Sequence, residues 1–232
     1  MPAASGTEGE SPAMRNWFGS DSPFMRFLGA AADLMLLNVL ALLTSIPVVT
    51  AGASLSAMFY CMIRMLRGDD TYTVRSYFHS FRENLGQGVI LTLIFGGIGV
   101  FLAFDLKAAE QLTGSAGAFF VKAVPIVMVV AEAVGICSFL LLARFRNTIR
   151  RTVGNAVILM MAAIPRTVVI LILLGLIGYA YRWFNVQILP VLLLFGVSLP
   201  AFLVVKLLDP MLVKMEERAR ETENSRTEEG EE

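Results

Sequence analysis

The sequence predicts an all-α fold, a polytopic transmembrane helical bundle of about six membrane helices arranged as three hairpins. Two observations lead to this prediction. Of the 232 residues, 56% are hydrophobic and only 16% are charged, whereas soluble domains average about 45–50% apolar and about 25% charged residues. The middle of the chain also contains several apolar runs of roughly 18 residues or more, which is the length that crosses a bilayer's hydrocarbon core as a helix.

The six predicted membrane segments are, in order, residues 27–46, 49–66, 85–104, 123–143, a stretch within 156–181, and 186–208. We expect residues 1–22 to be a disordered polar tail, residues 23–210 to form the membrane domain, and residues 211–232 to be an acidic disordered tail. Pro165-Arg166 interrupts the fifth segment. It is therefore either one span or an interfacial helix up to Ile164 followed by a span from Thr167.

The arginines and lysines indicate the orientation, because cytoplasmic flanks of membrane helices carry the excess of positive charge. With the N-terminus inside, nearly all of these residues lie on the inner side. The exceptions are Lys107, Lys122 and Arg182. The sequence therefore predicts a multi-pass protein of the cell membrane with both termini in the cytoplasm.

Two of the inner segments have an amphipathic pattern. In residues 73–85, apolar side chains recur at helical spacing opposite charged ones, and Phe145, Ile149 and Val153 do the same in the segment between the fourth and fifth spans. Each segment is either a helix lying among lipid headgroups or a docking surface for a cytoplasmic partner. The candidate surface residues are Arg75, Phe78, Phe81, Arg82, Arg146, Arg150 and Arg151.

The stretch Ser45-Ile46-Pro47-Val48-Val49-Thr50-Ala51-Gly52-Ala53-Ser54 interrupts two apolar runs. Pro47 lacks an amide proton and disfavours helical geometry at the residue before it, and Gly52 tolerates backbone angles that other residues avoid. Thr50 or Ser54 can accept hydrogen bonds from the first amides of the next helix. We expect a helical hairpin turn on the outer face, either purely structural or also in contact with a ligand.

Ionisable and amide side chains inside the spans are the other candidate functional residues. Glu132 lies near the middle of the fourth span and is either a protonated carboxyl bonded to a neighbouring helix or part of a substrate or proton pathway. Asp33 and Arg166 lie at similar depths, which suggests an ion pair between them. Asn38 is expected to make an interhelical polar contact.

Enzyme chemistry finds little support in the sequence. His79 is the only histidine, Cys61 and Cys137 lie in apolar runs, and no catalytic or metal-binding motif is present. We therefore expect no catalytic activity, no cofactor or metal, and no nucleic-acid partner.

The residues of the interrupted stretch carry a resemblance to a known family. Asn38, the run Ser45–Thr50, Gly52-Ala53-Ser54, Ala57 and Tyr60 resemble the YesL-like family of bacterial integral membrane proteins, and Phe78–Asn84 fits that family's aromatic and basic inner segment. The resemblance covers roughly residues 18–208. It implies no established biochemical function, but its members look like companions of carbohydrate-utilisation systems.

We therefore expect a non-catalytic accessory component associated with carbohydrate uptake or sensing. Its expected partners are the lipid bilayer and a sugar-uptake permease or sensor kinase. The alternatives are a small secondary transporter or channel that uses Glu132, and a permease-like subunit of an ATP-driven sugar importer. For the latter, Arg144–Pro165 is faintly similar to a coupling segment but lacks the usual Glu-Ala-Ala.

Overall fold

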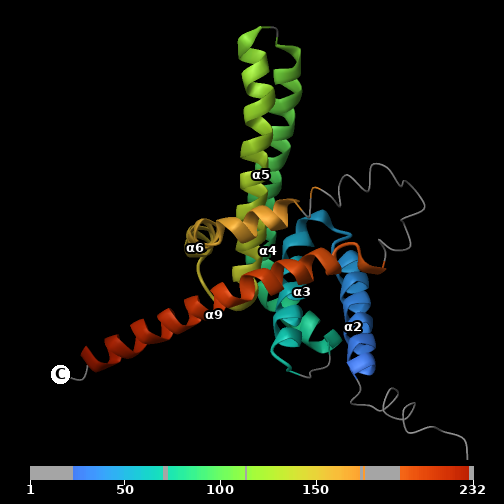
Figure 1. The fold of residues 1–232 in the computed structure, drawn as a ribbon, viewed down its shortest axis with the longest axis vertical. Coiled ribbons are helices and arrows are strands. Elements are labelled where there is room, and N and C mark those ends of the chain that lie inside the picture. The colour runs from blue at the N-terminus through green and yellow to red at the C-terminus, as the bar shows by residue number, and fades with distance from the viewer. Residues whose placement is uncertain (1–22, 70–72, 113, 173–174, 176–193, 230–232) are drawn as a thin grey trace, which may run out of the picture.

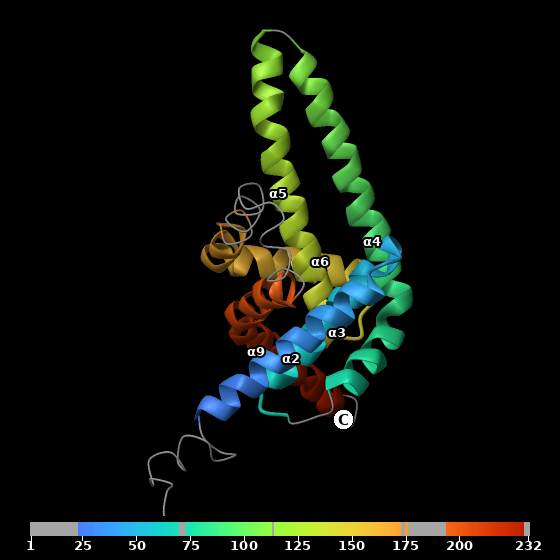
Figure 2. The ribbon, with the colours of Figure 1, turned by 90° about the vertical axis from the view of Figure 1, so that its right-hand side faces the viewer.

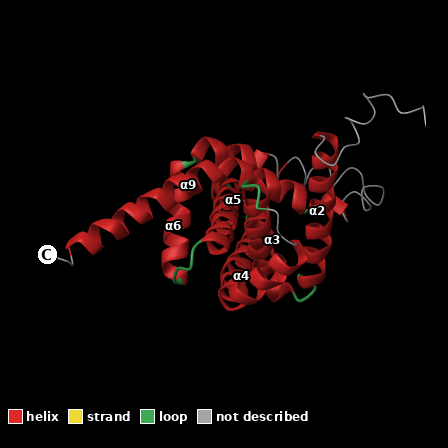
Figure 3. Cartoon of the chain, turned by 90° about the horizontal axis from the view of Figure 1, so that it is seen from below, coloured by secondary structure: helices red, strands yellow, loops and turns green. Residues whose placement is uncertain are grey.

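The computed structural model describes residues 23–69, 73–112, 114–172, 175 and 194–229. Within these ranges every regular element is a helix, which confirms the predicted all-α class (Figure 3). The elements are α2 (Pro23–Thr44), η1 (Val48–Thr50), α3 (Ala51–Leu66), α4 (Thr73–Gln111), α5 (Ser115–Arg144), α6 (Ile149–Ala162) and α9 (Ser198–Glu229). Here η1 is a single 3₁₀ turn, and a further helix, Ile164–Ile172, follows α6.

Four helices are long and apolar enough to cross a membrane, namely α2, α3 together with η1, α4 and α5. They contain the first four predicted segments and support a multi-pass membrane protein. A fifth candidate exists only if α6 and the helix Ile164–Ile172 are counted as one span. Residues 176–193, which contain the end of the fifth predicted segment and the start of the sixth, lie outside the described residues.

The fifth predicted segment is broken, as its proline suggests. Helices α6 and Ile164–Ile172 are bent by 91° relative to one another, with the break at Ala163. Pro165 then falls in the first turn of the second helix, where its missing amide costs nothing. Of the two alternatives, the structure favours two separate helices.

Helices α4 and α5 form a hairpin that extends well beyond the other helices (Figures 1 and 2). At about 1.5 Å per residue, α4 is roughly 58 Å long and α5 roughly 45 Å, and both exceed the hydrocarbon core of about 30 Å. The predicted surface helix 73–85 and the predicted third span are therefore one continuous helix. No proline or left-handed glycine separates them.

Helix α3 is the centre of the packing, with ten of its sixteen residues buried. Its small residues allow α4 to approach closely. A Cβ added at Gly88 of α4 would lie 2.7 Å from the backbone N of Ala53, and one at Gly52 would lie 2.8 Å from the carbonyl O of Gly88. At Gly96 and Gly97, further along α4, an added Cβ would meet nothing within 4 Å.

Helix α9 differs from the expected C-terminal tail. It runs to Glu229, so residues 211–229 are helical instead of disordered. The apolar stripe of Val205 and Leu208 continues to Leu212, and all three side chains are fully buried. The distal end of α9 extends away from the other helices (Figures 1 and 3).

Candidate functional site

The hydroxyl groups around the interrupted stretch bind one another. The side chains of Thr44, Ser54 and Tyr77, which we name the hydroxyl cluster, come from α2, α3 and α4. The Tyr77 hydroxyl lies 2.6 Å from Thr44 Oγ1 and 2.9 Å from Ser54 Oγ. Ser54 Oγ donates to the Ala41 carbonyl at 3.0 Å, and Thr44 Oγ1 donates to the Leu40 carbonyl at 2.8 Å. The cluster joins three helices and leaves no open polar site.

The turn between α2 and α3 is stabilised differently from the prediction. Thr50 does not cap α3 with its side chain; its Oγ1 reaches back to the carbonyls of Thr44 and Pro47 at 2.6 and 2.7 Å. The amide of Gly52 instead donates to Thr92 Oγ1 on α4 at 2.9 Å. The expected capping role of Thr50 or Ser54 is therefore wrong: the Thr50 hydroxyl turns back toward α2 and the turn, and Ser54 lies inside α3, beyond its first amides.

The outer surface of this turn is apolar. Ile46 and Val48 are 75% and 76% exposed, and Pro47 between them is also exposed. Polar groups face the protein interior and apolar groups face outward. The turn therefore has the surface of a segment in contact with lipid or with another apolar surface.

Asn38 makes the interhelical contact expected of it, and its partner is distant in sequence. Its side chain is fully buried, and its Oδ1 accepts hydrogen bonds from the amides of Val197 and Ser198, both at 2.9 Å. These amides belong to the start of α9, whose first N–H groups have no partner within the helix. Asn38 thus caps α9 from α2.

The predicted ion pair between Asp33 and Arg166 is wrong: it is absent from the described residues. Asp33 Oδ1 accepts a hydrogen bond from Thr73 Oγ1 at the start of α4, at 2.9 Å. Arg166 lies in the helix after α6, and its buried Nη1 has no hydrogen-bond partner among the described residues. The carboxylate of Asp33 therefore serves to hold α2 against α4.

A cluster that the sequence did not suggest fixes the far part of α9. Arg67 and Arg144, at the ends of α3 and α5, both bind Glu216, and we name these three residues the arginine–glutamate clamp. Arg67 Nη2 lies 3.2 Å from Glu216 Oε1, and Arg144 makes two contacts with the same carboxylate. Hydrogen bonds from Arg144 and then Arg67 lower the pKa of Glu216 to about 2. In the sequence, Leu208, Leu212 and Glu216 are four residues apart and share one helix face, which could have indicated that this face packs against the protein.

The two amphipathic inner segments lie next to each other. Arg146, just after α5, binds Glu83 in the first part of α4. The exposed members of the candidate surface are Arg75, Phe78, Arg82, Arg146, Arg150 and Arg151; we name these six residues the inner basic surface. Phe81 is half-buried and stacks on Tyr77 with ring centroids 6.3 Å apart. Ser76, Tyr77 and Ser80 form the buried face, so the predicted apolar stripe is only partly correct.

Glu132 lies on an exposed part of α5, at the edge of a groove of about 240 Å³. The other residues that line the groove are apolar, and they include Leu55 of α3 and Phe95 and Leu102 of α4. The described structure contains no hydrogen bond or ion pair to the Glu132 carboxyl. The expected bond to a neighbouring helix is therefore not seen among these residues.

The chain shows no metal centre in the ranges that the structure describes, since no three metal-binding side chains come together there. Cys61 and Cys137 are free and buried.

Comparison with known proteins gives one match. A family described as a protein of unknown function, DUF624, matches residues 34–106. This range runs from α2 through most of α4, and it contains the hydroxyl cluster and the close contact of Gly88 with Ala53. No curated protein and no solved structure matches the chain.

Proposed function

We propose that this chain is a non-catalytic membrane scaffold that acts as an accessory component of carbohydrate uptake or sensing. The observation that supports it best is the contrast between its interior and its inner surface. Asp33, Asn38, Thr50 and Gly52 are all engaged in contacts within or between helices, whereas the inner basic surface is exposed. A chain of this design offers a surface to a partner more readily than a pocket to a substrate.

The proposal keeps the inner basic surface and both termini in the cytoplasm, as the distribution of positive charge indicates. Exposed arginines beside an exposed aromatic ring are common in protein interfaces. The link to carbohydrates comes from the resemblance to the YesL-like family. The partner we propose is a sugar-uptake permease or a sensor kinase.

Purification from native membranes in a mild detergent, followed by mass spectrometry of the recovered proteins, tests this proposal. We expect wild type to recover a permease or a sensor kinase, and the variant Phe78→Asp with Arg82→Gln to lose it. Arg220→Gln, an exposed change on the distal part of α9, is the matched control. Phe81 is left intact because it packs on Tyr77. Recovery of neither partner class, or equal recovery by the variant, would count against the proposal.

A second function is favoured by the groove at Glu132. A single carboxyl beside an apolar groove is suited to a proton or cation pathway, because charged groups at membrane depth are costly unless they have a use. In that case Glu132→Gln should abolish solute uptake by proteoliposomes, while Glu110→Gln at the hairpin tip should leave it unchanged. Uptake that survives Glu132→Gln would exclude this residue from any transport step.

A further inference from the structure

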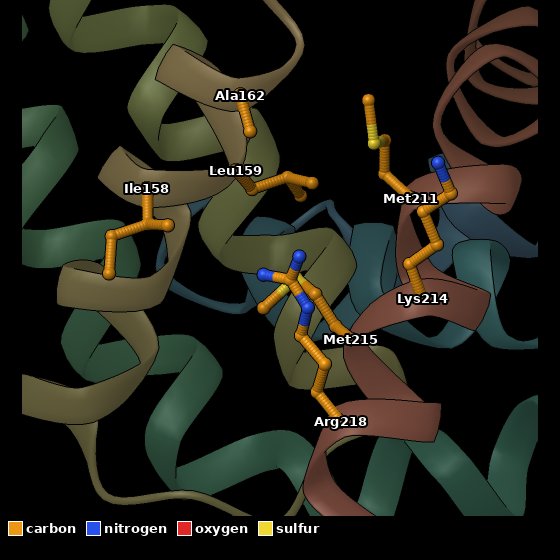
Figure 4. A pocket seen from close by; sticks show the side chains of 7 residues that line it. All are labelled: Ile158, Leu159, Ala162, Met211, Lys214, Met215 and Arg218. Atoms are coloured by element: carbon orange, nitrogen blue, oxygen red, sulfur yellow. The ribbon is translucent and has the colours of Figure 1, made fainter.

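The space between α6 and α9 combines apolar walls with two cations. A cavity of about 270 Å³ lies there. Helix α6 contributes Ile158, Leu159 and Ala162, and α9 contributes Met211 and Met215 together with Lys214 and Arg218. Figure 4 shows the guanidinium of Arg218 reaching into the space between the two helices, with Lys214 on the α9 side of it.

The depth of this cavity follows from the arginine–glutamate clamp. Glu216 lies between Lys214 and Arg218 in sequence, and it is bound to Arg144, the last residue of α5. Because α5 is a candidate membrane helix and Arg144 directly follows the apolar run of residues 123–143, we place the boundary between hydrocarbon and headgroups near Arg144. The cations of the cavity therefore lie within about one helical turn of that boundary, which is about 5.4 Å.

Glu216, which lies between the two cations in sequence, is bound to other residues. Glu216 is engaged with Arg67 and Arg144, which hold it on the other side of α9. No ion pair to Lys214 is present in the described residues. Arg218 has five N–H donors in a planar fork, so it can bind a phosphate while keeping another contact.

We propose that this cavity binds an anionic phospholipid of the inner leaflet. Lys214 and Arg218 bind the headgroup phosphate, and Ile158, Leu159 and Met211 contact the glycerol and the first part of one acyl chain. The volume is much smaller than a whole lipid, so the remaining chain stays in the bilayer. This site is distinct from the inner basic surface and goes beyond the proposed accessory function.

The apolar walls distinguish a lipid from a free phosphate ion as the occupant. A free anion gains nothing from methionine and isoleucine side chains, whereas a lipid can keep its first acyl CH₂ groups against them and out of water while its phosphate meets the cations. The cations alone would serve both occupants equally. The combination therefore fits an amphiphile with one negative headgroup.

Native mass spectrometry of the purified full chain, exchanged into defined lipids, tests the proposal. We expect phosphatidylglycerol to remain bound through detergent removal and phosphatidylcholine to be lost. The variant Lys214→Gln with Arg218→Gln should retain roughly tenfold less phosphatidylglycerol, since a charged hydrogen bond corresponds to about that factor. The variant Lys206→Gln with Arg220→Gln removes two exposed cations of α9 that do not line the cavity, and it should retain as much as wild type.

A second variant tests the apolar part. Ala162→Trp fills the cavity from the exposed end of α6 and should reduce phosphatidylglycerol retention without removing a charge. Equal retention of both lipids by wild type, or unchanged retention in both cavity variants, would overturn the proposal. Displacement of the lipid by inorganic phosphate alone would also overturn it, because the occupant would then be the free anion. No partner protein is needed, so failure of the accessory function would leave this result intact.

Discussion

Within residues 34–106, the range matched by the DUF624 family, single side chains act mainly on the packing between helices. Tyr77 is fully buried and its hydroxyl joins α2 to α3, although its position in an amphipathic segment suggested a residue at the membrane surface. The sequence could show that Ser45–Ser54 interrupts two helices. It could not show that Thr92 and Tyr77, distant in the chain, would bind that stretch, because periodicity reports which face a residue occupies and not what that face meets.

The close approach of α3 and α4 makes Gly88 sensitive to an increase in side-chain size. In Gly88→Ala the new Cβ would meet backbone atoms of Ala53, which cannot rotate away. We expect a loss of about 1–3 kcal/mol in the free energy of unfolding, measured as a lower apparent melting temperature in detergent. Gly96→Ala is the control, since its Cβ meets nothing within 4 Å. Equal melting temperatures for the two variants would contradict the helix contact.

At the scale of elements, α9 is held at its start and near its middle. Asn38 caps its first turn, and the arginine–glutamate clamp holds it near its middle. The clamp docks α9 as far as Glu216, inside the segment whose composition suggested a disordered tail. Composition averages over a window, whereas a single carboxylate bound by two arginines is enough to dock a helix.

The cap is tested by Asn38→Leu, which removes the acceptor for two amides at the start of α9. We expect a loss of about 1–3 kcal/mol, the cost of leaving buried donors without a partner. Faster proteolysis or hydrogen exchange at residues 197–201 would report it. Asn38→Asp keeps an oxygen in the same place and should exchange more slowly than Asn38→Leu. Identical exchange in the two variants would mean that the cap contributes nothing.

The clamp is tested by Glu216→Gln, with exposed Glu217→Gln as control. We expect the first variant to lose about 1–3 kcal/mol and the second to be unaffected. The folded-state pKa of Glu216 is lowered from 4.5 to about 2, so its contribution is complete above pH 4.5 and is lost as the pH falls toward 2. Hydrogen exchange of α9 should therefore be the same at pH 7 and pH 5, apart from the intrinsic rate. A wild-type clamp that opens at pH 5 would contradict this.

At the scale of the whole molecule, apolar length predicted the membrane class and the first four helices. Apolar length did not predict that the surface helix 73–85 and the third span form the single helix α4. The reason is that no proline or left-handed glycine separates the charged residues from the apolar ones. Apolar length alone could not decide whether the fifth segment is one span or an interfacial helix followed by a span; the bend at Ala163 was needed for that. The depth of each turn in the bilayer also depends on packing, which apolar length does not report.

The α2–α3 turn and the tip of the α4–α5 hairpin lie at different depths. Gly52 is bonded to Thr92, and α4 continues from there to Gln111, which is roughly 28 Å at about 1.5 Å per residue. The first exposed charge after Thr92 on this helix is Asp105, only roughly 20 Å away at about 1.5 Å per residue, which is shorter than the hydrocarbon core of about 30 Å. Exposed charges cluster near the tip, at Asp105, Lys107, Glu110 and Lys122. The exposed side chains of the turn are apolar and its polar groups are bonded internally, as irregular backbone within a bilayer requires.

We therefore expect α2 and α3 to enter from the inner side and turn within the bilayer, with Arg26 and Arg67 at the inner ends. In a chain with Cys61→Ala and Cys137→Ala, Val48→Cys should resist a membrane-impermeant maleimide in intact cells. Ser115→Cys should be labelled from outside, and Arg150→Cys only after the membrane is opened. Labelling of Val48→Cys from outside would instead support a hairpin in which α2 and α3 both cross the membrane completely. Both side chains are exposed on the protein itself. If Val48→Cys is not labelled while Ser115→Cys is, the bilayer must cover the turn.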